Sequence, residues 1–97
     1  MSNIEKLVKQ IENSQAWDID DYDPKYNPDD IVVIQNKRTD WDGAKINIIL
    51  DSDEDTVTEI CFDGGTYEEV GDNYTIYSPS DFEALNELMD MCKPYFK

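Results

Sequence analysis

Apolar residues recur with a helical period near both ends of the chain. Positions 4, 7, 8 and 11 share one helical face, and Ser2 followed by Glu5 is a capping-box pattern, so we predict a helix over residues 3–15. A second helix is predicted to begin after Ser78, with Pro79 in its first position, and to end just before Pro94. Its predicted apolar stripe consists of Phe82, Leu85, Leu88 or Met89, and Cys92.

Between these helices the apolar period changes to that of β-strands. Residues 31–34 form a β-branched run, and alternating positions predict further strands at 46–50 and 57–62, with turns within 36–43 and 51–55. Residues 66–70 and 73–77 are shorter extended pieces, joined around Gly71 and Asp72 as in a tight hairpin. The pattern predicts one α+β domain over residues 1–97: an N-terminal helix, an antiparallel meander of three to five strands, and a C-terminal helix packed on the sheet.

Residues 16–30 fit neither period. They hold six Asp, two Pro and the aromatic residues Trp17, Tyr22 and Tyr26. The prolines exclude a continuous helix, and the aromatic content is too high for a flexible linker, so we expect an ordered acidic loop. We expect Trp17 to belong to the core. For Trp41, which falls in a predicted turn, a core position and a partner contact are equally compatible with the sequence.

Charge narrows the possible functions. The 97 residues include 23 acidic and 8 basic side chains and no His, which gives a formal charge of -15. A chain of this charge repels polyanions, so direct binding to nucleic acid or to a membrane surface is not expected. The apolar runs are far shorter than the ~20 residues of a membrane span. With no recognisable export signal, we expect two reduced cysteines and a cytoplasmic location.

Neither a metal site nor a catalytic site is expected. Carboxylates at positions 51, 53 and 55 imitate the first ligands of a calcium loop, but Thr56 stands where that loop needs Gly and Phe62 where it needs Glu. The absence of His removes the commonest general base, and Cys61 has acidic neighbours that disfavour a reactive thiolate. We therefore expect no enzymatic activity, no metal and no cofactor.

The acidic residues have a one-sided distribution. Residues 46–92 hold 13 acidic side chains and no basic one. Because this much charge of one sign opposes folding by self-repulsion, we infer that it serves to bind a basic partner. Alternate residues of a strand face the same way about 6.6 Å apart. Glu59 with Asp63, or Asp51 with Asp53 and Asp55, would then present carboxylates at a spacing similar to that of nucleic-acid phosphates.

A resemblance supports the same interpretation. The capped first helix opening with residues 3–7, the apolar run at 46–50, the acidic residues Glu68, Glu69 and Asp72, and a pI near 4.1 resemble the small phage-encoded anti-CRISPR proteins that mimic DNA. The resemblance implies an inhibitor that acts in the bacterial cytoplasm and occupies the nucleic-acid-binding cleft of a CRISPR effector nuclease. Such a nuclease reads its PAM with paired arginines and holds nucleic acid in a positively charged channel.

The predicted partner-binding residues form two groups. The first consists of Asp51, Asp53, Glu54, Asp55, Glu59, Asp63, Glu68, Glu69 and Asp72. The second consists of residues 18–30, with the aromatic residues Tyr22 and Tyr26 among their aspartates, together with Asp40, Trp41 and Asp42. Two other functions stay open: an immunity protein that neutralises a basic bacterial nuclease toxin, and an adaptor or dimerisation module that uses the aromatic residues without charge. A monomer and a homodimer are both compatible with the sequence.

Overall fold

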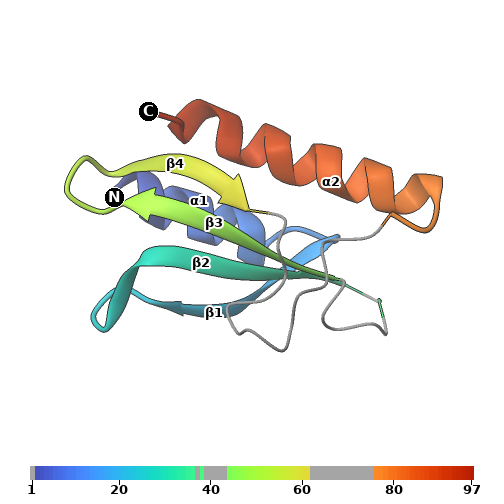
Figure 1. Ribbon diagram of the computed structural model, residues 1–97, viewed down its shortest axis with the longest axis horizontal. Coiled ribbons are helices and arrows are strands. Elements are labelled where there is room, and N and C mark those ends of the chain that lie inside the picture. The colour runs from blue at the N-terminus through green and yellow to red at the C-terminus, as the bar shows by residue number, and fades with distance from the viewer. Residues whose placement is uncertain (1, 37, 39–43, 62–75) are drawn as a thin grey trace.

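Residues 2–36, 38, 44–61 and 76–97 are described by the computed structural model, in which an antiparallel sheet carries two helices on one face (Figure 1). The strands are ordered β1-β2-β3-β4. The predicted α+β fold, with its N-terminal helix, antiparallel meander and C-terminal helix packed on the sheet, is confirmed. The elements are α1 (Asn3–Glu12), β1 (Trp17–Asp23), β2 (Asn27–Gln35), β3 (Lys45–Asp51), β4 (Thr56–Cys61), α2 (Pro79–Cys92) and the 3-10 turn η2 (Lys93–Tyr95).

The acidic loop predicted for residues 16–30 is wrong, because most of this segment forms the hairpin of β1 and β2. The two strands pair antiparallel from Trp17 opposite Gln35 to Asp23 opposite Asn27. The Asp23 carboxylate accepts hydrogen bonds from the backbone N–H groups of residues 25 and 26, at 2.9 and 3.3 Å. This side-chain turn, with Pro24 inside it, reverses the chain.

Register shifts in β1 and a proline in β2 explain why the sequence pattern did not predict this hairpin. The register of β1 shifts between Ile19 and Asp21 and again between Asp21 and Asp23, so the alternation of inward and outward side chains is interrupted. Pro28 lies near the start of β2, a position that tolerates a residue without an N–H group. Pro24 therefore lies in the turn and Pro28 near the start of a strand, and both positions are compatible with a hairpin.

Other predicted boundaries agree closely with the structure. Helix α1 ends before residue 15 because the Ser14 hydroxyl accepts the N–H groups of Ala16 and Trp17, which turns the chain into β1. Strands β2 and β3 pair antiparallel, as expected for a hairpin. Residues 39–43 of the predicted turn, the extended piece predicted at 66–70 and residues 73–75 of the piece predicted at 73–77 lie outside the described residues, whereas Ile76 and Tyr77 are described and form no strand.

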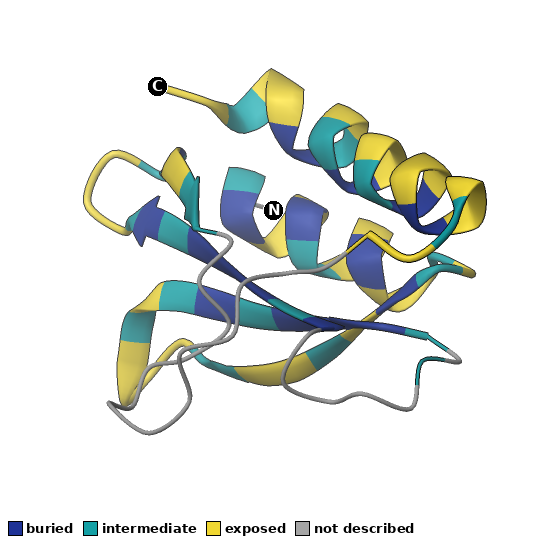
Figure 2. Cartoon of the chain, turned by 45° about the vertical axis from the view of Figure 1, so that its right-hand side comes forward, coloured by how far each residue is buried: buried dark blue, intermediate teal, exposed yellow. Residues whose placement is uncertain are grey.

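The hydrophobic core fills the space between the two helices and one face of the sheet (Figure 2). Positions 4, 7 and 11 of α1 are buried, as their helical spacing predicts. The opposite face of the two central strands is also partly shielded from solvent, since Ile34 and Asn47 on that face are buried. The fully buried side chains of the core include Leu7, Ile11, Trp17, Ile31, Val33, Ile46, Ile48, Val57, Leu88 and Cys92.

Trp17 connects the edge strand to the C-terminal helix. Its indole ring is fully buried, as predicted, and its Nε1–H donates a 2.7 Å hydrogen bond to the Ala84 carbonyl. Small Ala84 allows this close approach. The buried side of α2 runs through residues 81, 84, 88 and 92. The predicted core position of Phe82 is wrong, since this residue is 53% exposed.

A buried polar cluster attaches the start of α2 to β2. Gln35 donates a 2.9 Å hydrogen bond to Asp81, whose carboxylate also accepts the Tyr77 N–H at 2.8 Å and lies 3.9 Å from the Arg38 guanidinium. Burial by itself would raise the pKa of Asp81, but these hydrogen bonds and the Arg38 charge outweigh it, so the pKa is lowered. Position 81 is therefore a structural anion as well as a favourable charge at the helix start.

We expect Trp17→Phe to destabilise the protein by about 1–3 kcal/mol, because it removes a buried hydrogen bond and the packing of the larger ring. Chemical unfolding followed by circular dichroism measures this change. Phe82→Leu, at an exposed aromatic position, is the control and should change the free energy of unfolding by less than about 0.5 kcal/mol. Equal effects of the two substitutions would contradict the assigned role of the indole.

Candidate partner-binding groove

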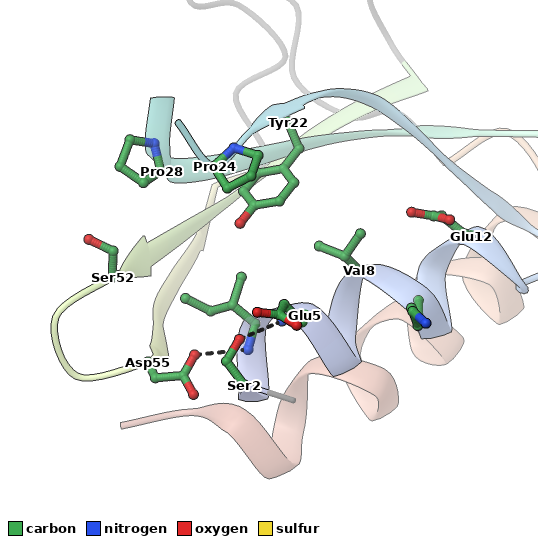
Figure 3. A pocket seen from close by; sticks show the side chains of 11 residues that line it. Ser2, Glu5, Val8, Glu12, Tyr22, Pro24, Pro28, Ser52 and Asp55 are labelled. Atoms are coloured by element: carbon green, nitrogen blue, oxygen red, sulfur yellow. Dashed lines mark hydrogen bonds between the residues drawn. The ribbon is translucent and has the colours of Figure 1, made fainter. Parts of the chain in front are cut away.

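The β1–β2 turn, the β3–β4 turn and the start of α1 lie at one end of the sheet (Figure 3). Successive connections of an antiparallel meander alternate between its two ends, so the first and third turns share one end. A groove of about 610 Å³ lies between them and α1. This volume is within the range of small-molecule and side-chain binding pockets, roughly 300–1,000 Å³.

The groove has an apolar floor and an acidic rim. Val8 on α1 lies across from Tyr22, Pro24 and Pro28 of the hairpin, and the Tyr22 ring points from the hairpin towards α1 (Figure 3). The charged lining consists of three carboxylates and one ammonium group, which leaves a formal charge of -2. These charged residues are Glu5, Glu12, Asp55 and Lys9.

Asp55 builds the corner of the groove by capping α1 from 51 to 52 residues away in sequence. Its carboxylate accepts the N–H of Asn3 at 2.6 Å and the N–H of Ile4 at 3.0 Å. The N–H groups of residues 5 and 6 bind the hydroxyl and the carbonyl of Ser2, at 3.1 and 3.0 Å. The N–H groups of residues 3, 4 and 5, which have no partner within the helix, are thus satisfied by Asp55 and the Ser2 hydroxyl, and Lys6 makes the first regular helical hydrogen bond.

The backbone of Asp55 is adapted to this role. Its φ of 59° lies in the left-handed region, which Asp enters more readily than most residues. The hydrogen bonds from Ile4 and Asn3 lower the pKa of the Asp55 carboxyl, so it stays ionised at neutral pH. The turn is also tied to the C-terminal residue, because Lys97 lies 3.6 Å from Asp51 and 3.0 Å from Glu54.

The first group of predicted partner-binding residues is partly engaged within the fold. Asp51 accepts the N–H groups of Asp53 and Glu54, both at 3.1 Å, so residues 51–55 form a turn and the spacing of a straight strand does not apply to them. Glu59 is exposed on β4. The other predicted residues lie outside the described part of the chain: Asp40, Trp41, Asp42, Asp63, Glu68, Glu69 and Asp72.

The second predicted group lies mainly on the β1–β2 hairpin, residues 17–35, which we call the acidic hairpin. Asp20 forms an ion pair with Lys45 at 3.3 Å, and Asp30 accepts a 2.6 Å hydrogen bond from Asn27. Asp18, Asp21 and Asp29 are exposed. Their carboxylates form no hydrogen bond or ion pair with other described residues, so they are available to a partner.

Of the charged groove residues, Asp55 was predicted to bind a partner, whereas Glu5, Lys9 and Glu12 were not. Glu5 and Glu12 are seven positions apart on a helix, a spacing that places them on one side together with Val8. This periodic signal is present in the sequence, although it was used only to predict the buried face. The contribution of Tyr22 depends on the hairpin, which the sequence pattern did not reveal.

The described residues show few groups suited to catalysis or metal binding. Within them, no three carboxylate or thiol side chains converge on a position for a metal ion. Cys61 and Cys92 are free thiols, and burial raises the pKa of Cys92 to about 12, so its thiolate is scarce at neutral pH. None of the helices in the described ranges is long and apolar enough to cross a membrane.

Comparison with protein-family models, with curated proteins and with solved structures finds no match to this chain.

We expect Glu5→Gln to lower the pKa of Tyr22. Burial raises this pKa above the ordinary 10.0, and the charges of Glu5, Asp55 and Asp23 raise it further, because a phenolate facing carboxylates is disfavoured. Removing one carboxylate brings the pKa back towards 10.0. A pH titration of the tyrosine ring carbons by NMR measures the change. Glu83→Gln on α2 is the control, and an equal shift in both variants would show that Glu5 has no specific effect.

We expect Asp55→Asn to destabilise the protein at neutral pH, because a neutral amide caps two N–H groups less well than a carboxylate. The lowered pKa means that this stabilisation is complete above the ordinary value of 3.8 and is lost as the pH falls through the folded-state pKa. Urea midpoints measured across this range should therefore converge for wild type and variant in acid. Asp53→Asn is the control and should leave the midpoint unchanged; a difference independent of pH would refute the capping role.

Proposed function

We propose that this chain is a non-enzymatic inhibitor that binds a basic nucleic-acid-binding enzyme through its acidic hairpin and the adjoining groove. The observation that carries the proposal is the set of exposed, unengaged carboxylates on the hairpin, at Asp18, Asp21 and Asp29. Carboxylates already used within the fold, such as Asp55, are less available to lysine or arginine of a partner. The acidic hairpin is therefore the first surface to test.

The location of these carboxylates favours recognition of a cleft. Among the described strands, β1 lies at the edge of the sheet, so its carboxylates stand along a border of that sheet and not in the middle of a broad face. A narrow acidic edge can enter a positively charged channel that normally holds nucleic acid. Tyr26, at the tip of the hairpin and 78% exposed, adds an aromatic side chain of the kind that contributes strongly to interfaces.

A CRISPR effector nuclease is the target that we propose first. Such an enzyme combines paired arginines that read the PAM with a positive channel for nucleic acid, and an acidic protein competes with DNA for both. Support for this choice comes from the overall charge of -15 and from the resemblance in architecture. A basic nuclease toxin presents similar chemistry, so an immunity function is the main alternative outcome of the experiment.

The test uses the purified chain with a purified, guide-loaded CRISPR nuclease and, in parallel, with a basic nuclease toxin. Binding to the nuclease should be blocked by its target DNA and should weaken steeply as salt is raised, because salt screens exposed charges over about 8–10 Å. Inhibition of the toxin alone would replace the first target by the second. A complex that persists in saturating DNA and in high salt would refute nucleic-acid mimicry.

Within this experiment, Asp18→Asn with Asp21→Asn should reduce affinity about five- to tenfold, since each exposed ion pair contributes up to about 1 kcal/mol. Glu83→Gln with Asp90→Asn removes the same charge from the exposed side of α2 and is the matched control, with an expected change below about twofold. Asp53→Asn with Glu54→Gln measures the β3–β4 turn separately. Equal losses in the hairpin and α2 variants would mean that only net charge matters.

A further inference from the structure

We propose that the groove between α1 and the two turns binds one arginine side chain, with its guanidinium beside Glu5 and Glu12 and its aliphatic stem along Val8 and Tyr22. The inference rests on the proposed function only for the origin of the arginine, which would come from the basic partner. It identifies a pocket for one side chain, in addition to the general acidic surface of the hairpin.

The charge of the groove selects a cation. Three carboxylates and one ammonium group line it, and no ion pair within the described residues joins Lys9 to either Glu5 or Glu12. The carboxylates of these two residues are therefore not held in an ion pair by the lysine that lines the groove with them. The pKa of Tyr22 agrees with this picture, because it is raised first by burial of the ring and then by the negative charges of Glu5, Asp55 and Asp23.

The apolar floor distinguishes a cationic side chain from a simple metal or ammonium ion. Ile4, Val8 and the two prolines cannot replace the hydration shell of a small ion. They do suit the methylene stem of a long basic side chain, which commonly packs on apolar surface while its charged end reaches polar groups. The groove therefore combines contacts for both parts of one residue.

Between the two basic residues, the groove favours arginine. A guanidinium is planar and less strongly hydrated than an ammonium, so it loses less on entering a partly apolar groove. Its flat face can stack on an aromatic ring such as Tyr22, and its fork of N–H donors can engage a carboxylate with two bonds. Glu5 and Glu12 approach from the α1 side and the Tyr22 ring from the hairpin side (Figure 3).

The direct test is an NMR titration of the isotope-labelled full chain with N-acetyl-arginine amide, without any nuclease. We expect saturable shifts of the backbone amides of Glu5, Val8 and Tyr22. N-acetyl-citrulline amide, which has the same shape without the charge, should cause no saturable shifts there, and N-acetyl-lysine amide should bind more weakly. Equal shifts with citrulline would overturn the role of charge, and equal affinity for lysine would overturn the assignment to arginine.

Two variants complete the test. Glu5→Gln with Glu12→Gln should weaken arginine binding by about fivefold, whereas Glu83→Gln with Asp90→Asn should change it less than about twofold. Tyr22→Leu keeps all the groove charges and should also weaken binding, through loss of the ring face. Shifts confined to the acidic hairpin, or insensitivity to both groove variants, would refute the pocket.

The test of the arginine pocket and the test of the inhibitor function can fail independently of each other. If the chain inhibits no nuclease but its groove binds arginine, the proposed function fails and the pocket remains. If a nuclease is inhibited and the groove variants bind both arginine and nuclease as wild type does, the pocket fails and the function remains.

Discussion

The hydrogen bonds from α1 to the Asp55 carboxylate determine how the two halves of this domain meet. They connect the first turn of a helix to a strand turn about 50 residues later, and they satisfy N–H groups that would otherwise remain without partners. The same contact fixes the separation of α1 from the β3–β4 turn, which is one side of the groove. A buried or partly buried charge that stabilises the fold in this way also supplies part of the negative potential of the site.

The use of carboxylates as hydrogen-bond acceptors within the fold explains how so acidic a chain can fold. Asp55 and Asp81 each accept backbone N–H groups, and Asp51 closes its own turn, so these carboxylates stabilise local structure despite the repulsion between like charges. Other carboxylates have no such contact among the described residues: Asp18, Asp21 and Asp29 form one group on the acidic hairpin, and Glu5 and Glu12 line the groove. Whether a carboxylate is engaged within the fold is thus a more specific guide to its availability for binding than the charge density of the sequence.

The sequence predicted those features that depend on local periodicity. The helix starts at Ser2 and Ser78 and the strands β3 and β4 follow from residues within a few positions of each other. The hairpin over residues 17–35 was missed because two register shifts interrupt its alternation. The cap from Asp55 and the groove beside Tyr22 join distant segments, and such contacts have no local signature in a single sequence.

The two edges of the sheet differ in how they are covered, and this difference gives a physical reason for the aspartates on β1. On the outer side of β4, the chain end pairs with Val57, and the N–H of Lys97 donates a 3.0 Å hydrogen bond to its carbonyl. Among the described residues, no strand pairs with the outer side of β1. An exposed edge strand invites pairing with another chain, and charged side chains along it oppose that pairing, most strongly against a second copy of the same acidic edge. The aspartates of β1 therefore disfavour self-association through this edge while leaving it electrostatically attractive to a basic surface.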